Sequence, residues 1–131
     1  MGKELPAALE SEDWRRRVSA LKTIERNGIE ISDFPNYKRF MTSNHLPERF
    51  WFVGTLGVSR RPDTYKMIFP FLDDPQPNVE RMALHALGQR GNSMAIPEIK
   101  KRIETSDNWF AQWYAYKALR ALGWKQVKES K

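Results

Sequence analysis

The sequence predicts an all-α protein, folded as a short right-handed α-solenoid of about four helical hairpins. The first observation is a recurring Ala-Leu motif whose anchoring leucines, Leu56, Leu87 and Leu119, lie 31 and 32 residues apart. The second is that proline and glycine fall where helices of this period should begin and end. The third is that no stretch shows the two-residue alternation of a half-buried strand. Such a period is typical of stacked repeats, in which one unit cannot bury its apolar face alone.

Three copies of the motif align closely, at residues 48–57, 78–88 and 111–119. A fourth, looser copy contains Ala20-Leu21, and its leucine lies 35 residues before Leu56. Together the copies cover the chain from its first long helix to its last.

Eight helices are expected, each with a start or a stop signal. Ser11-Glu12-Asp13-Trp14 and Ser106-Asp107-Asn108-Trp109 are near copies of one capping sequence, and Asp74-Pro75-Gln76-Pro77 fills the same slot. Ser, Asp and Asn suit these places because they accept hydrogen bonds from free backbone N–H groups. Four starts carry a proline: Pro35, Pro47, Pro62 and Pro77. Three stops carry a glycine: Gly28, Gly91 and Gly123. The expected ranges are 3–10, 12–26, 34–42, 46–58, 62–72, 77–90, 93–105 and 108–122.

Two segments depart from the repeat. Ile29–Asn44 fits the motif poorly and the step between copies is longest there, so we expect a loose connection or a distorted repeat. The helix at Leu5–Glu10 is the second half of a hairpin whose first half is missing. We interpret it as a terminal cap, and the alternative is that the domain follows other segments in a longer relative.

The composition indicates a single domain over residues 1–131. Cysteine is absent, which excludes disulfides and thiolate metal sites. The N-terminus lacks the apolar stretch of a signal peptide, and no run approaches the roughly 20 apolar residues of a membrane span. We therefore expect a cytoplasmic protein without membrane insertion. A net charge of +6 favours acidic proteins, nucleic acid or anionic lipid as partners, unless it reflects only a mixed surface.

One stretch carries a family resemblance. Val79-x-Arg81-x-Ala83-x-x-Ala86-Leu87-Gly88-x-x-Gly91, followed by Ala95-Ile96-Pro97-x-Ile99, resembles the HEAT-like repeats first described in phycobilisome lyases. The resemblance covers nearly the whole chain and is closest from Asp73 to Leu122. Departures from the family pattern stand at Glu80, Gln112, Phe52 and Thr55.

The resemblance implies a scaffold, because HEAT-like solenoids mostly bind proteins along a concave surface. Hydroxylases of the deoxyhypusine type hold iron through His-Glu pairs, and neither His45 nor His85 is followed by Glu. HEAT-like DNA glycosylases are longer and need a catalytic carboxylate, whereas Asp73-Asp74 lies at a helix end, where capping and turn formation suit it. A lyase-type enzyme subunit is a remote alternative.

The second helices of the hairpins offer one candidate surface. Helical projection at about 100° per residue turns Arg39, Lys66 and Lys101 outward, with Arg102 beside the last of them. In HEAT-like solenoids these helices line the concave side, so the four cations are predicted to form a basic ladder there. The alternative is an ordinary solvated surface.

The last helix offers a second candidate surface. Its core face is formed by Ala111, Tyr114, Ala115, Ala118 and Leu122. The opposite face carries Trp109, Trp113, Tyr116 and Arg120. Large exposed aromatic side chains commonly mark contact sites. The alternative is that the tail Gly123-Trp124-Lys125-Gln126-Val127 folds back and covers them.

The sequence therefore predicts a non-enzyme with no catalytic residue, no metal ligand and no cofactor. Its expected partner is a protein that docks on the ladder, on the aromatic face or on both. A partner that docks on the basic ladder is expected to be acidic. A nucleic-acid-binding module using the ladder is the alternative. Self-association through the aromatic face is a further expectation.

Overall fold

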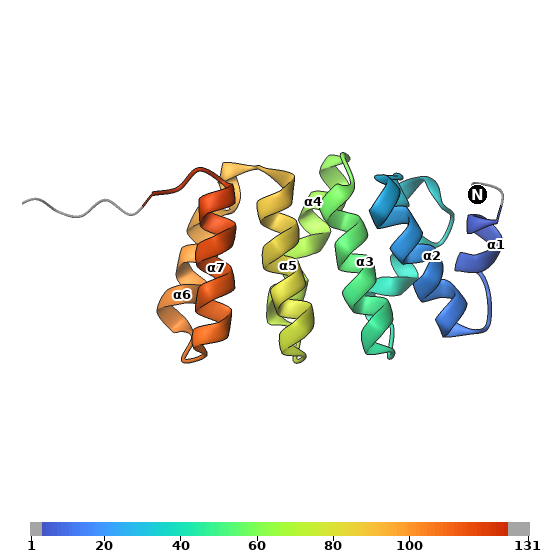
Figure 1. Ribbon diagram of the computed structural model, residues 1–131, viewed down its shortest axis with the longest axis horizontal. Coiled ribbons are helices and arrows are strands. Elements are labelled where there is room, and N and C mark those ends of the chain that lie inside the picture. Colours follow the sequence, from blue (N-terminus) through green and yellow to red (C-terminus); the bar gives the residue numbers. More distant parts are fainter. Residues whose placement is uncertain (1–3, 126–131) are drawn as a thin grey trace, which may run out of the picture.

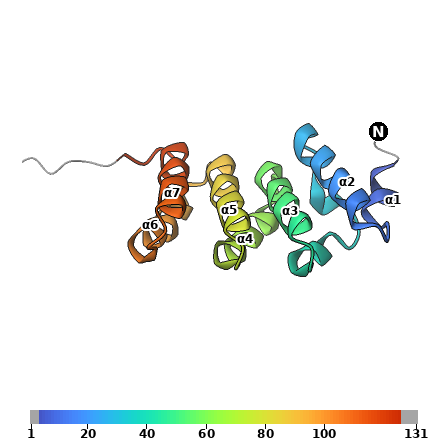
Figure 2. The same cartoon turned by 60° about the horizontal axis from the view of Figure 1, so that its bottom comes forward.

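The computed structural model describes residues 4–125, and every regular element in this range is a helix, with no strand. Helices stand side by side in two rows (Figure 1). The first row contains α2 (Trp14–Asn27), α3 (Leu46–Val58), α5 (Pro77–Arg90) and α7 (Trp109–Ala121). The second row contains α1 (Leu5–Leu9), α4 (Pro62–Ile68) and α6 (Ile96–Thr105), and Figure 2 shows α4 and α6 beneath α5 and α7. The all-α solenoid predicted from the repeat is confirmed.

Short 3-10 helices complete the second row. They are η1 (Ile31–Asp33), η2 (Tyr37–Thr42), η3 (Phe69–Asp73) and η4 (Ser93–Ala95). The helix expected at 34–42 is replaced by η2, which follows Asn36 in a left-handed conformation with φ of 61°. The helix expected at 62–72 changes to 3-10 geometry at Phe69, because Pro70 cannot donate the hydrogen bond that an α-helix needs there.

One capping arrangement recurs before the first-row helices, as the repeated Ser-x-Asp/Asn pattern predicts. The hydroxyls of Ser11, Ser43 and Ser106 each accept a hydrogen bond of 3.1 Å from the backbone N–H two residues on. In the α5 copy, Asp74 Oδ1 accepts the equivalent bond from Gln76 at 2.9 Å. The same turn therefore sets the start of all four helices.

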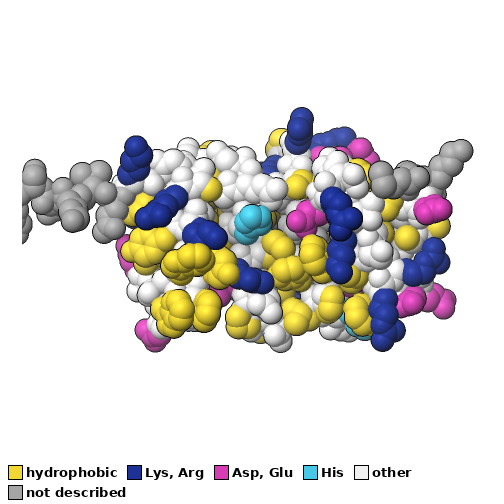
Figure 3. Space-filling model, viewed as in Figure 1, with side chains coloured by type: hydrophobic (Ala, Val, Ile, Leu, Met, Phe, Trp, Pro, Cys, Tyr) yellow, Lys and Arg dark blue, Asp and Glu magenta, His cyan; other side chains and the backbone are white. Residues whose placement is uncertain are grey.

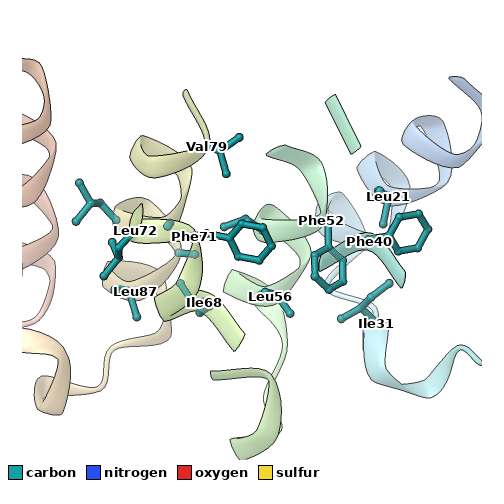
Figure 4. Close-up of a cluster of buried hydrophobic side chains, with 14 of the residues drawn as sticks. Leu21, Ile31, Phe40, Phe52, Leu56, Ile68, Phe71, Leu72, Val79 and Leu87 are labelled. Carbon is teal, nitrogen blue, oxygen red and sulfur yellow. The ribbon is translucent and has the colours of Figure 1, made fainter. Parts of the chain in front are cut away.

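The core lies between the two rows. Phe52 is fully buried, and its ring centroid lies 5.7 Å from that of Phe40 and 6.2 Å from that of Phe71. Figure 4 shows these rings among aliphatic side chains from neighbouring hairpins. The labelled members of this cluster are Leu21, Ile31, Leu56, Ile68, Leu72, Val79 and Leu87. Because each hairpin buries its apolar face against the next, the core is continuous along the stack.

Neighbouring first-row helices approach closely at glycine. A Cβ atom added to Gly57 would lie 3.1 Å from the Cα of Ala86, and one added to Gly88 would lie 3.3 Å from the Cα of Ala118. These distances leave no room for a larger side chain without displacement of the neighbouring backbone. The small residues of the repeat therefore set the spacing between first-row helices.

Buried ion pairs link successive hairpins. Arg17 donates from Nε to Glu48 Oε2 at 2.8 Å and from Nη2 to Oε1 at 2.7 Å, and its Nη1 binds the Ser11 carbonyl at 2.7 Å. Arg49 makes the same arrangement one hairpin later, with Asp74 at 2.9 Å and the Ser43 carbonyl at 2.7 Å. These arginines hold the first-row helices to the turns that precede them.

The last copy keeps part of this arrangement with a different residue. Gln112 Nε2 donates to the Ser106 carbonyl at 2.7 Å and to the Ile103 carbonyl at 3.3 Å. Glu80 occupies the equivalent position in α5, and burial raises the pKa of its carboxyl group. At Gln112, the departure from the family pattern thus replaces an arginine hydrogen bond to the turn by an amide hydrogen bond.

Candidate functional site

Helix α7 positions the most exposed aromatic side chains of the described part of the chain. Asn108 caps the helix by accepting a hydrogen bond from the backbone N–H of Phe110 at 2.9 Å. Ala115, Ala118 and Leu119 face the preceding hairpin and are buried. Because the helix is fixed by this packing, its opposite face is turned to solvent.

Four aromatic side chains lie on that exposed side. The exposed fractions are 66% for Trp109, 56% for Phe110, 51% for Trp113 and 38% for Tyr116. We call this group the α7 aromatic patch. The exposure expected for three of its members is confirmed. Phe110 is an addition, because its helical projection lies between the two faces and does not predict exposure.

The rings of the patch contact one another and nearby cations. Trp109 and Phe110 stack with centroids 4.2 Å apart and planes inclined by 23°. The ammonium nitrogen of Lys117 lies 4.6 Å from the centroid of the Trp113 ring. Both contacts reduce the freedom of the exposed rings, and preorganised aromatic side chains lose less entropy on binding.

Alternating cations and aromatic rings extend from the patch across the first row. Arg81 of α5 bridges two hairpins, with its guanidinium carbon 5.3 Å from the Tyr114 ring centroid and 5.8 Å from that of Phe50. Lys22 of α2 lies 5.0 Å from the Trp51 ring centroid. In Figure 3, apolar side chains gather over α7 and over the centre of this face, with Lys and Arg side chains around them.

A small hollow lies between α5 and α7 beside the patch. Its volume is about 230 Å³, and its walls include Arg81, Phe110 and Tyr114. The Tyr114 hydroxyl lies 3.3 Å from Arg81 Nη1, which donates to it. Glu80 also lines the hollow, which therefore combines aromatic rings with a cation and a carboxylate and suits an apolar side chain that is flanked by polar groups.

Within the described residues, the tail covers only the Tyr116 end of the patch. The Trp124 ring centroid lies 6.3 Å from that of Tyr116, and the Lys100 ammonium lies 5.8 Å from the Trp124 ring. Trp109 and Trp113 remain more than half exposed. The remaining residues of the expected covering tail, Gln126 and Val127, lie outside the described residues.

The basic ladder divides into free and engaged cations. Lys66 and Lys101 are exposed and have no ion-pair partner among residues 4–125. Arg39 is exposed too, but its Nη1 lies 3.2 Å from Glu10 Oε2. All three lie on second-row elements, in η2, α4 and α6.

Arg102 links two hairpins through hydrogen bonds and an ion pair. Its Nη1 donates to Asp73 and to the Leu72 carbonyl, the latter at 3.2 Å, and its Nη2 lies 3.4 Å from Glu98 Oε1. The hydrogen bond from Arg102 lowers the pKa of Asp73. Arg102 therefore has protein partners for its guanidinium, whereas Arg120 on α7 is exposed and borders a hollow of about 410 Å³ with Trp124.

The remaining polar candidates are engaged in structure. The rings of His45 and Trp14 stack with centroids 5.2 Å apart, and Asp73 and Asp74 bind arginines of other hairpins. Within residues 4–125, no three His, Cys, Asp or Glu side chains are grouped to hold a metal ion. In the same range, no helix has both the length and the apolar character that a membrane crossing requires.

Comparison with known proteins identifies one family. HEAT repeats match residues 39–128, which is more than half of the chain. No curated protein and no solved structure matches. The matched segment contains α3 to α7, the ladder residues and the whole α7 aromatic patch. With its two rows of helices and its repeated seams, the chain belongs to the HEAT repeat family.

Proposed function

We propose that the chain is a single-domain, non-catalytic scaffold that binds a protein partner through the α7 aromatic patch. The observation that carries this proposal is the contiguous exposure of Trp109, Phe110, Trp113 and Tyr116 on one helix. HEAT repeats generally serve as protein-interaction scaffolds. A cluster of this kind on a soluble surface usually marks a contact site.

The chemistry of the patch supports a protein partner with apolar anchors. Trp and Tyr are among the residues that contribute most to binding energy, and central ones contribute about 2 kcal/mol or more when truncated to alanine. The hollow between α5 and α7 offers a place for one side chain of the partner beside Phe110 and Tyr114. These two aromatic rings of α7 would exclude water from that contact.

The cations around the patch favour an acidic partner. Arg81 and Lys117 lie against aromatic rings and Arg120 is exposed at the other end of the helix. None of the three has an ion-pair partner among the described residues. Carboxylates of a partner would therefore meet unpaired charges at the rim of an apolar centre, which favours orientation and rapid association.

A double substitution tests the proposal. The full chain serves as bait in an extract of its source cell, bound proteins are identified, and the affinity of the purified partner is then measured. Trp109→Ser with Trp113→Ser should weaken that affinity at least tenfold. Met94→Ser is the matched control, because Met94 is 80% exposed and lies in η4, outside the patch. Equal affinity of the double variant and the parent would overturn the proposal.

Nucleic-acid binding is the second candidate, and the unpaired Lys66 and Lys101 favour it. Phosphate binding by these cations and Arg39 should weaken steeply with salt, because neutralised phosphates release counterions. An oligonucleotide titration between about 50 and 200 mM salt should then show a fall of several-fold or more. Replacing all three cations by Glu should abolish this binding without loss of the fold. If the oligonucleotide does not bind, or binds independently of salt, nucleic-acid binding by these cations is wrong and only the protein-binding proposal remains.

A further inference from the structure

The α7 aromatic patch occupies a defined position in the repeat. With the leucine spacings of 31 and 32, Trp113 corresponds to Phe50 in α3 and Arg81 in α5. By the same spacings, Arg120 corresponds to Gly57 and Gly88. Trp109 and Tyr116, on the same face of α7 as Trp113 and Arg120, correspond to Pro77 and Leu84 of α5.

In the inner hairpins these positions face the next first-row helix. Phe50 contacts Arg81 of α5, and Gly57 faces Ala86 of the same helix. One hairpin later, Gly88 faces Ala118 of α7. The positions equivalent to Tyr116 are buried there, with exposed fractions of 0% for Val53 and 1% for Leu84. The stripe of Trp109, Trp113, Tyr116 and Arg120 is therefore the stacking face of the last described hairpin.

Arg120 prevents this face from accepting another hairpin at the spacing of the inner seams. At the equivalent Gly57 and Gly88, even a Cβ atom would lie only 3.1 Å from the Cα of Ala86 and 3.3 Å from the Cα of Ala118, respectively. A guanidinium side chain and two indole rings hold any neighbour farther away. The occupant of the face must therefore present large side chains or charges of its own, as a second copy of α7 does.

The charges along α7 are arranged for pairing with an antiparallel copy. Glu104, in the last turn of α6, and Asp107, in the turn that follows it, lie near the N-terminal end of α7; Lys117 and Arg120 lie toward its C-terminal end, and Lys125 follows it. None of these five is in an ion pair within the described residues. Asp107 precedes Trp113 by six residues and Arg120 follows it by seven. In an antiparallel copy with Trp113 near the two-fold axis, the turn that contains Asp107 comes close to the end of the helix that carries Arg120, twice.

We propose that two copies of the chain associate end to end, through antiparallel pairing of their α7 stacking faces about a two-fold axis. Such an isologous contact closes on itself and stops further growth. This proposal rests on the proposed function, because the same aromatic side chains form the docking surface. It names a second copy of the chain as the occupant of that surface. Dimer formation competes with partner binding at this face.

The size of the face predicts a weak dimer. At their observed exposures, the four aromatic side chains leave on the order of 400–500 Å² open per copy. Two copies would therefore bury about 1,000 Å², at the lower limit of a specific interface. Association should accordingly depend on concentration, with a Kd in the micromolar range or above.

Sedimentation velocity of the full chain over a range of concentrations tests the association. The parent should shift from monomer to dimer, and Trp113→Ser should raise the Kd at least tenfold while leaving the melting temperature nearly unchanged. Met94→Ser should dimerise as the parent does. A parent that stays monomeric at millimolar concentration overturns the proposal.

A charge exchange tests the register. Arg120→Glu or Asp107→Lys alone should raise the dimer Kd at least threefold, because each places like charges opposite one another. The two changes in one chain should restore dimerisation, since opposite charges then face each other again. Lys101→Glu, on the second row, is the control for net charge. Failure of the combined variant to recover dimerisation, with a native melting curve, overturns the antiparallel pairing.

The two proposals fail in different assays. If the chain is monomeric but Trp109→Ser with Trp113→Ser abolishes capture of an identified partner, self-pairing is wrong and the proposed function stands. If the double variant keeps its partner but loses the dimer, the patch serves self-association and the proposed function is wrong.

Discussion

At the scale of single residues, two buried carboxylates in the first row have opposite electrostatic roles. Glu48 lies in a bidentate ion pair with Arg17 and also accepts a hydrogen bond of 3.0 Å from Ser43. Burial alone would raise the pKa of Glu48, but the hydrogen bonds from Arg17 and Ser43 outweigh it, so the pKa is lowered. The charged form of Glu48 therefore stabilises the fold.

Glu48→Gln should lower the free energy of unfolding at pH 7 by about 3 kcal/mol, because it leaves the Arg17 charge buried without its partner. Since the pKa of Glu48 is lowered on folding, its contribution is present above the ordinary glutamate range and is lost on acidification below it. The gap between variant and parent should thus narrow below about pH 4. Urea denaturation of the variant and the parent, from pH 7 to below about pH 4, measures this difference in the free energy of unfolding. Glu12→Gln, at an exposed position, should change stability by less than about 0.5 kcal/mol; an equal loss in both variants would contradict the assignment.

Glu25 of α2 presents the reverse case. Its Oε1 is buried without a hydrogen-bond partner and lies against Gly54 of α3, where an added Cβ would meet it. Burial raises the pKa of Glu25, because the charged form loses its hydration. At neutral pH the charged carboxylate therefore opposes folding.

Glu25→Gln should raise the melting temperature at pH 7. The raised pKa means that the unfavourable contribution is absent below the ordinary glutamate range, where both states are neutral, and grows as pH rises from the ordinary glutamate pKa to the raised pKa of the folded state, above which it is constant. The advantage of the variant should consequently vanish near pH 3. Thermal melts at pH 7 and about pH 3 compare the melting temperature of the variant with that of the parent. A gain that is the same at both would show that the charge is not its source.

At the scale of secondary-structure elements, the seam between α3 and α5 depends on small side chains. Ala83 and Ala86 are fully buried, and Ala86 lies against Gly57. Ala83→Leu and Ala86→Leu should each lower stability by roughly 1–3 kcal/mol, because the extra methylenes have no space between two packed helices. His85→Leu is the control on the same helix, since His85 is exposed. Melting of either seam variant at the parental temperature would disprove the close packing.

The boundaries of the elements show what local sequence specifies. The ranges expected for α3 and α5, 46–58 and 77–90, agree with the structure, because proline or a capping turn begins each one and the apolar period continues through it. The segment 34–42 was expected to be α-helical and is not. Asn36 adopts a left-handed conformation after Pro35, so only the short η2 follows. Packing of Phe40 beneath α3 then holds that turn in place.

At the scale of the whole molecule, stability and binding are predicted to reside in different side chains. Because Trp109 and Trp113 are mostly exposed, replacing both by Ser should lower the free energy of unfolding by no more than about 1 kcal/mol. This is the energy expected for losing one contact between aromatic rings and one contact between a ring and a cation. Phe52→Ala should by contrast lose about 3–5 kcal/mol, because its ring fills the core between the rows. Guanidinium denaturation of the two variants measures the difference. If the protein is monomeric and the double tryptophan variant loses a large part of its free energy of unfolding, Trp109 and Trp113 belong to the core and the exposed assignment is wrong.

The arrangement of the rows explains which surfaces remain open. The most extensive contacts join α2 with α3, α3 with α5 and α5 with α7, whereas α4 and α6 make little contact with one another. First-row helices therefore cover each other in succession, and only the last one lacks a successor among the described residues. This position, together with the tryptophans that occupy it, distinguishes α7 from the inner helices.

The all-α architecture, the period and most helix boundaries could be predicted from the sequence, because these depend on local capping, on proline and glycine, and on the spacing of apolar residues. The exposed side of the last helix, with Trp109, Trp113 and Tyr116, was predictable in the same way. Which charges form ion pairs became known from the packing of the hairpins. Arg17 and Glu48 lie 31 residues apart, and Arg102 finds Asp73 across 29 residues. Such pairs form when hairpins stack, and no local pattern distinguishes an arginine that will meet a carboxylate from one that will face water.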